Sequence, residues 1–198
     1  FIASVLFIII IGIKDSVFEC NSATNVGAIY SESNTILIGS DTEYLQTRLI
    51  SNTATNGGAL YTVGKLTVTN VEISENKATN GAGIYVKDCI NGNYSVLSNV
   101  NLNKNTASNG AGIYLNNANL KLTNNTNISE NTATNGAGLY LATNNNLNVD
   151  PTTSIANNRA TNGAGLYSAN LNTTWATDAS ITGLTTGTVY DNIANKGN

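Results

Sequence analysis

The chain has 198 residues, a net charge of −3 and only 11% charged residues. Nucleic-acid binding requires a basic face, so this composition argues against a nucleic-acid partner. The absence of His removes the usual acid–base and imidazole–metal sites. We therefore predict no cofactor, no metal and no catalytic residue.

An apolar segment opens the chain over residues 1–13 and ends at Lys14 and Asp15. It is too short to span a bilayer, which needs about 20 residues. Its length matches the apolar part of a secretory signal peptide. Two interpretations stay open for residues 1–17: a signal remnant, or a retained segment whose strand 8–13 caps the following domain or contacts another subunit. Any membrane contact is expected to come from this segment.

From residue 18 onward the chain repeats one pattern, seen most clearly over 76–85 as Asn-Lys-Ala-Thr-Asn-Gly-Ala-Gly-Ile-Tyr. The first residues of the six copies are Asn21, Asn52, Asn76, Asn105, Asn131 and Asn158, and a seventh copy over 192–198 is cut short. Their spacing of 24 to 34 residues is typical of a solenoid. Period-two alternation, as in Val71-Glu72-Ile73, predicts strands.

Each coil is expected to hold about three short strands, which in the second coil cover 57–63, 66–70 and 71–76. Stacked coils place each strand parallel to its copy, about 4.8 Å away. The predicted fold is an all-β, right-handed parallel β-helix of about six coils over 18–198. The right hand is expected because parallel crossovers almost always adopt it.

Equivalent positions then form ladders along the axis. One Asn column is expected to pair its side-chain amides from coil to coil, and its members are Asn25, Asn56, Asn80, Asn109, Asn135 and Asn162. Gly follows this Asn in every copy except the first, which has Val26. That Gly predicts a turn with unusual backbone angles.

A Tyr column closes each copy and is expected to point outward, with members Tyr30, Tyr61, Tyr85, Tyr114, Tyr140 and Tyr167. Two interpretations stay open for it. The rings can stack on one another and stabilise the coils, or they can form a platform for sugars or a neighbouring subunit.

Two further functions were weighed from the side chains. A Thr column suggests an ice-binding face, but Ser22, Lys77 and Arg159 interrupt the second column that such a face needs. A polysaccharide-processing β-helix needs acids on one face, and Asp41, Asp88, Asp150 and Asp178 share no column. We therefore predict that the chain is not an enzyme, with polysaccharide binding or processing as an alternative.

Cys20 and Cys89 lie about two coils apart, so an intrachain disulfide would require loop bending. Glycosylation sequons begin at Asn93, Asn124, Asn127 and Asn172, and in a chain rich in Asn and Thr some arise by chance.

The repeats resemble the polymorphic outer membrane protein repeat of chlamydial surface adhesins, which carries Phe-x-x-Asn and Gly-Gly-Ala-Ile motifs. Phe18-Glu-Cys-Asn21 matches the first motif and Gly57-Gly-Ala-Leu60 the second, while most other copies read Gly-Ala-Gly-Ile or Gly-Ala-Gly-Leu. The resemblance implies a secreted or cell-surface β-helix with an adhesive or structural role and a possible glycan or host-surface ligand. Open strand edges at the ends further suggest head-to-tail stacking of copies into a filament.

Overall fold

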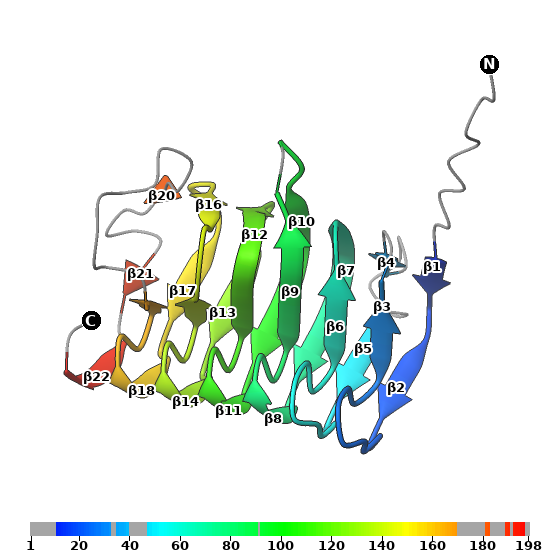
Figure 1. Ribbon diagram of the computed structural model, residues 1–198, viewed down its shortest axis with the longest axis horizontal. Coiled ribbons are helices and arrows are strands. Elements are labelled where there is room, and N and C mark those ends of the chain that lie inside the picture. The colour runs from blue at the N-terminus through cyan, green and yellow to red at the C-terminus, as the bar shows by residue number, and fades with distance from the viewer. Residues whose placement is uncertain are drawn as a thin grey trace.

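The computed structural model describes residues 11–32, 35–39, 47–90, 92–169, 181–182, 189–190 and 192–196. Regular structure in these residues is β-strand throughout, and each strand pairs in parallel with its equivalent in the next coil. The coils stack side by side along the long axis as a parallel β-solenoid of about five turns (Figure 1). The predicted fold class is confirmed, and the expected six coils are close to this number.

The strands of the solenoid lie on three faces. The Tyr-bearing face holds β3 (Ile29–Ser31), β6 (Leu60–Val63), β9 (Ile84–Cys89), the start of β12 (Ile113–Thr123), β15 (Leu139–Leu141) and β19 (Leu166–Ser168). A five-stranded sheet holds β8 (Lys77–Asn80), β11 (Thr106–Asn109), β14 (Thr132–Asn135), β18 (Arg159–Asn162) and β22 (Ile193–Lys196). This second face lies along the lower edge of Figure 1.

The third face is longer and bends within each coil. Its first half holds β1 (Ile11–Lys14), β4 (Thr35–Ile38), β7 (Leu66–Ser74), β10 (Ser95–Asn103), the end of β12, β16 (Asn146–Val149) and β20 (Ile181–Thr182). Its second half holds β2 (Val17–Glu19), β5 (Thr47–Ile50), the ends of β7 and β10, β13 (Asn127–Ser129), β17 (Ser154–Ala156) and β21 (Val189–Tyr190).

The strand boundaries differ from those expected in the second coil. The predicted strands 66–70 and 71–76 are one strand, β7, bent at Asn70, whose φ is 55°. Asn tolerates this left-handed conformation, so the chain turns a corner without leaving the sheet. The residues after Asn76, where no strand was expected, form β8 and pair with β11. Tertiary pairing with the next coil therefore decides these boundaries.

The N-terminal segment contributes a strand to the solenoid. Among the described residues, strand β1 pairs in parallel with β4, which agrees with the interpretation of this segment as a retained strand that contacts the following domain. Residues 1–10 lie outside the described residues, so the predicted cap over 8–13 is described only from Ile11.

Apolar columns fill the interior as the repeat predicts. The largest fully buried side chains are Leu49, Leu60, Leu66, Ile73, Ile84, Leu97, Leu102, Ile113, Leu115, Leu120 and Leu122. A smaller, separate cluster of Ala side chains lies behind the five-stranded sheet, formed by Ala111, Ala133, Ala137, Ala160 and Ala164. Each coil thus contributes to a continuous axial core, which no single coil could bury alone.

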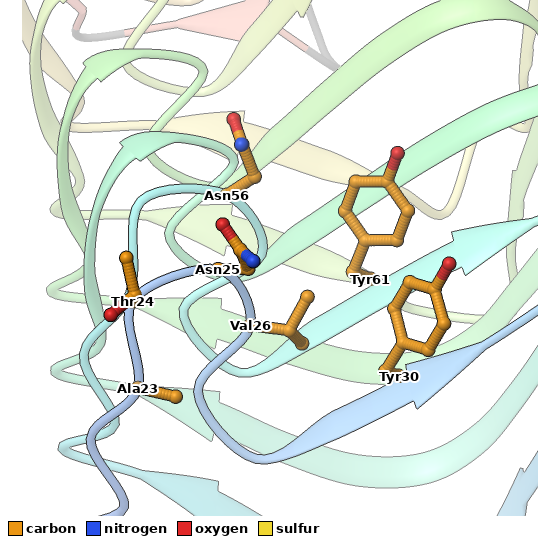
Figure 2. Close-up of a pocket in the computed structure, with 7 residues that line it drawn as sticks. All are labelled: Ala23, Thr24, Asn25, Val26, Tyr30, Asn56 and Tyr61. Carbon is orange, nitrogen blue, oxygen red and sulfur yellow. The ribbon is translucent and has the colours of Figure 1, made fainter.

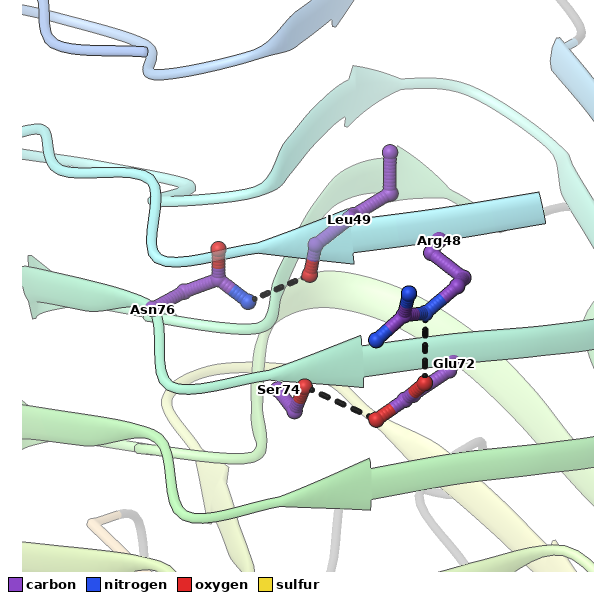
Figure 3. Close-up of polar contacts among 5 residues, drawn as sticks. All are labelled: Arg48, Leu49, Glu72, Ser74 and Asn76. Carbon is purple, nitrogen blue, oxygen red and sulfur yellow. Dashed lines mark hydrogen bonds and ion pairs between the residues drawn. The ribbon is translucent and has the colours of Figure 1, made fainter. Parts of the chain in front are cut away.

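A ladder of Asn side chains, which we call the buried Asn ladder, runs beside this core. Its members are the first residues of the repeats: Asn21, Asn52, Asn76, Asn105, Asn131, Asn158 and Asn192. The Asn105 Oδ1 accepts from both the backbone N and the Nδ2 of Asn76, each at 3.0 Å. The Nδ2 of Asn76 also donates to the Leu49 carbonyl at 2.9 Å (Figure 3). The same bonds recur in the interior coils, where these Asn side chains are fully buried.

The residue before each of the first six ladder Asn residues adopts a left-handed conformation. Its φ lies between 56° and 60° at Cys20, Ser51, Glu75, Lys104, Glu130 and Asn157. This turn swings the chain from the third face into the five-stranded sheet and aims the Asn amide inward. These residues thus form a corner of the backbone in each coil, and the residue type at this corner varies from copy to copy.

We predict that the buried Asn ladder contributes more stability than the half-buried Asn column after it. Asn105→Ala would leave the Asn76 backbone N without its acceptor and the Asn76 Nδ2 with only the Leu49 carbonyl, at about 1–3 kcal/mol for each N–H left unsatisfied. Asn109→Ala, the matched control, removes an amide that water can replace, so about 1 kcal/mol is expected. Denaturant melts of both variants measure the difference, and equal losses would contradict it.

At Thr62 we predict a substitution that increases the stability of the protein. Its hydroxyl is fully buried and has no hydrogen-bond partner in the described structure. The equivalent residue of the next coil is Val86. Thr62→Val should therefore raise the free energy of unfolding, by about 1–3 kcal/mol, because a desolvated polar group is removed at nearly constant shape. Thr62→Ser, which keeps the hydroxyl and loses a methyl, should lower it. A destabilised Thr62→Val variant would show that the hydroxyl is satisfied in solution.

Candidate functional site

The six Tyr side chains of the repeat form one continuous stack. Successive ring centroids lie 5.4, 4.7, 4.6, 4.8 and 5.2 Å apart from Tyr30 to Tyr167, and neighbouring planes differ by no more than 24°. The parallel strand register fixes this spacing, because each Tyr pairs with the Tyr one coil away. The stacking interpretation of the column is thus observed directly.

The turn that the copies share explains why a Gly stands four residues before the Tyr in the repeat. Gly57 has a φ of +60°, and a Cβ added there would lie 2.7 Å from the Tyr61 Cβ. The Gly at 81 has the same conformation and the same close approach to Tyr85. The turn therefore needs Gly both for its backbone angle and to let the Tyr side chain lie over it. The first copy has Val26 at this position and no left-handed angle there.

The expected outward stripe is largely covered. Tyr85 is only 8% exposed, since Tyr61 and Tyr114 cover both faces of its ring. Tyr30 is 51% exposed, because its ring is stacked on one side only. Tyr85 therefore offers little accessible surface, while a contact role for the column stays a prediction. The accessible ring lies at the first-coil end of the stack.

An open hollow of about 590 Å³ lies at that end, and we call it the first-coil hollow. Its lining comes from the turn of the first coil and from the coil behind it: Ala23, Thr24, Asn25, Val26, Tyr30, Asn56 and Tyr61. Figure 2 shows the Tyr30 and Tyr61 rings side by side on one flank, with the Asn25, Asn56 and Thr24 side chains on the other.

The second Asn column, which we call the outer Asn ladder, is confirmed from Asn56 to Asn162. Each Nδ2 donates to the Oδ1 of the previous coil, at 3.0 Å for Asn80 to Asn56 and at 2.9, 2.8 and 2.6 Å for the following rungs. These side chains are half-buried, whereas the interior members of the buried Asn ladder are fully buried. No such bond joins the side chains of Asn56 and Asn25, although the Asn56 backbone N donates to the Asn25 carbonyl at 2.9 Å. The ladder thus stops one rung before the first coil.

Sequence reasoning assigned Asn25 and Tyr30 to regular ladders and missed what sets them apart. The available signal was Val26, the departure from Gly in the first copy. Glu32 was missed as well, and it accepts a short hydrogen bond from the Tyr30 hydroxyl. That bond, then burial, raises the pKa of Tyr30. The hydrogen bond to Glu32 holds the Tyr30 ring in place.

Regular hydroxyl columns face outward from the five-stranded sheet and the turn beside it. Exposed side chains there are Thr53, Thr55, Lys77, Thr79, Thr106, Ser108, Thr132, Thr134, Arg159 and Thr161. Lys77 and Arg159 interrupt one column, as expected from the sequence. An ice-binding role stays a prediction.

The carboxylates are separate and engaged individually. Glu72 lies 2.9 Å from the Arg48 Nε and accepts from the Ser74 hydroxyl at 3.1 Å (Figure 3). Asp88 accepts from the Asn117 Nδ2 at 2.8 Å. Within the described residues no three acidic, Cys or His side chains gather as a metal site would require. Asp41 and Asp178 lie outside them.

Asp150 closes the loop after β16. Burial raises the pKa of its carboxyl, but hydrogen bonds from Thr152, Asn124 and Thr153 outweigh that effect and lower it. One carboxylate with several local donors is the pattern of a turn-forming residue. It therefore explains loop geometry and suggests no proton-transfer role.

Both cysteines are free thiols, exposed at Cys20 and buried at Cys89. Of the sequon asparagines, Asn93 and Asn124 are exposed. The Nδ2 of Asn127 donates to Asn101 at 3.1 Å and to Ser129 at 3.0 Å, so glycosylation there would break a ladder contact. Asn172 lies outside the described residues.

Comparison with protein-family models, curated proteins and solved structures found no match. The likeness to the chlamydial repeat therefore stays a resemblance of short motifs. Within the described residues, no helix is long and apolar enough to cross a membrane.

We predict a loss of stability at alkaline pH that originates in the Tyr stack. Burial, then the charges of Tyr85 and Tyr140, raises the pKa of Tyr114 to about 12, and burial also raises the pKa of Tyr61 and Tyr140. Unfolded Tyr titrates near pH 10, so the folded state favours the protonated phenol more strongly than the unfolded state does. The resulting contribution to the free energy of unfolding is complete below about pH 10 and is lost as the pH rises towards about 12. Melting temperatures and tyrosinate absorbance across that range measure the effect.

Tyr114→Phe is the matched control for this titration. It keeps the stacked ring and removes the hydroxyl, so its melting temperature should fall less over the same pH range. An identical fall in both proteins would assign the alkaline loss to other groups.

Proposed function

We propose that this chain is an extracellular, non-enzymatic β-solenoid that serves as a stiff structural and adhesive repeat domain. The observation that carries the proposal is the buried Asn ladder, in which each interior amide is satisfied by the coils on either side. Such bonding makes neighbouring coils depend on one another and favours a rigid rod. The separate, locally engaged carboxylates support a role without catalysis.

The extracellular and adhesive parts of the proposal rest on the repeat motifs and on the surface. The described surface carries long rows of Thr and Asn and few charges, and one aromatic ring stands exposed at the end of the Tyr stack. A neutral, hydroxyl- and amide-rich surface suits contact with other neutral polar polymers, such as glycans.

Scattering and activity measurements on the whole chain test the rod. We expect an elongated particle, one cooperative melting transition and no cleavage of soluble polysaccharides. Turnover by the wild-type chain that is abolished in Glu72→Gln, Asp88→Asn or Asp150→Asn would overturn the structural role. It would favour the polysaccharide-processing alternative instead.

Antibody labelling tests the location. An antibody to the solenoid should label intact cells of the source organism as strongly as permeabilised cells. Labelling that requires permeabilisation would overturn the extracellular placement, whatever the shape of the molecule.

A further inference from the structure

We infer that the first-coil hollow binds a neutral sugar residue of a glycan. This inference deepens the adhesive part of the proposed function and rests on it. It assigns the contact to one end of the solenoid, where Tyr30 and Asn25 stand outside the ladders that engage their equivalents.

The Tyr30 ring supplies an apolar platform with a fixed orientation. One face is stacked on Tyr61 at a centroid distance of 5.4 Å, and the ring hydroxyl donates to Glu32. The side chain remains 51% exposed, so its other face is available. The C–H face of a pyranose packs on such a ring as other apolar groups do. Little conformational entropy is lost on binding, because the ring is already held in place.

Polar side-chain groups lie beside the ring and retain hydrogen-bonding capacity that the neighbouring coil does not use. The Asn25 carboxamide makes no side-chain hydrogen bond to Asn56, the neighbour that its ladder position would supply. The Asn56 Oδ1 accepts from Asn80, while its Nδ2 lacks the donation to the preceding coil that the later rungs make. A carboxamide both donates and accepts, as a sugar hydroxyl does, so these groups suit vicinal sugar hydroxyls.

The charge and size of the hollow narrow the ligand class. Its lining residues are Ala, Thr, Asn, Val and Tyr, and none carries a charge at neutral pH. An anionic sugar would find no cation there, whereas a neutral sugar needs only hydrogen bonds for the hydroxyls that leave water. The volume of about 590 Å³ falls within the usual range for small-ligand sites.

The site belongs to the first coil because later coils close it. There the Tyr rings cover one another and the outer Asn ladder links each carboxamide to its neighbours. Gly at the turn also lets the Tyr lie close to the backbone, as at Gly81 and Tyr85. The first coil has Val26 at this turn, and the Val26 side chain lines the hollow (Figure 2).

Ligand-observed NMR on the whole chain tests the assignment. The probes are the methyl glycosides of glucose, galactose, mannose and N-acetylglucosamine, with glucuronate and sialic acid as charged comparisons. We expect saturation transfer to at least one neutral glycoside and none to the charged sugars. Tyr30→Ala should abolish the transfer, and Tyr30→Phe should retain it, because the ring face carries the contact.

Two further variants separate binding from folding. Tyr167→Ala, at the other end of the stack, removes the stacking contact with Tyr140 and should leave binding unchanged. Asn25→Ala should weaken binding roughly tenfold, as expected for losing one or two hydrogen bonds. Circular dichroism and melting temperature should be similar for Tyr30→Ala and Tyr167→Ala.

Several outcomes would overturn the inference. Wild-type protein that is folded and elongated but binds no neutral glycoside would remove the sugar site and leave the rod intact. Binding that survives Tyr30→Ala, or that extends to the charged sugars, would place the ligand elsewhere. Concentration-dependent association that buries Tyr30 would assign the hollow to a second copy and support the head-to-tail filament.

Discussion

The buried Asn ladder is the constraint on which the rest of the structure depends. A narrow solenoid turns its chain sharply in every coil, and each turn leaves backbone groups without strand partners. Here the Asn105 Oδ1 accepts the Asn76 backbone N, and its Nδ2 returns a bond to the Ile73 carbonyl. One side chain thus satisfies groups in its neighbouring coils. Burying these groups unpaired would be costly, which accounts for the Asn at this position in every copy of the repeat.

The ladder also sets the spacing of everything outside it. Once consecutive corners are joined, the strands between them share one register, and residues of equal position lie above one another. The Tyr rings then meet at 4.6 to 4.8 Å in the middle of the stack, near the strand separation of about 4.8 Å. Stacking is therefore a consequence of register, and the raised pKa of Tyr114 is a consequence of stacking.

A ladder satisfies its interior members and leaves its first member different. At the first coil Tyr30 has one stacked neighbour and Asn25 no amide partner in its ladder, and Val26 stands where later coils have Gly. Chemical groups used for stability along the rod are available for contact at this end. The first coil thus differs from the later coils in one residue of its turn and in the pairing of two side chains.

The sequence by itself determined the architecture, the columns and the residue types on each face, because a period of 24 to 34 residues with fixed Asn, Gly and Tyr positions permits little else. It also identified the outer Asn ladder and the Tyr stack as aligned sets. Only the tertiary structure decided which Asn column is fully buried, since both columns are equally regular in the sequence. The left-handed turn at residues such as Glu75 and Lys104 aims the amide of the next residue inward, and this places the buried Asn ladder beside the core. It likewise decided that Tyr85 is covered and Tyr30 accessible, because exposure depends on the coils stacked on either side of a residue.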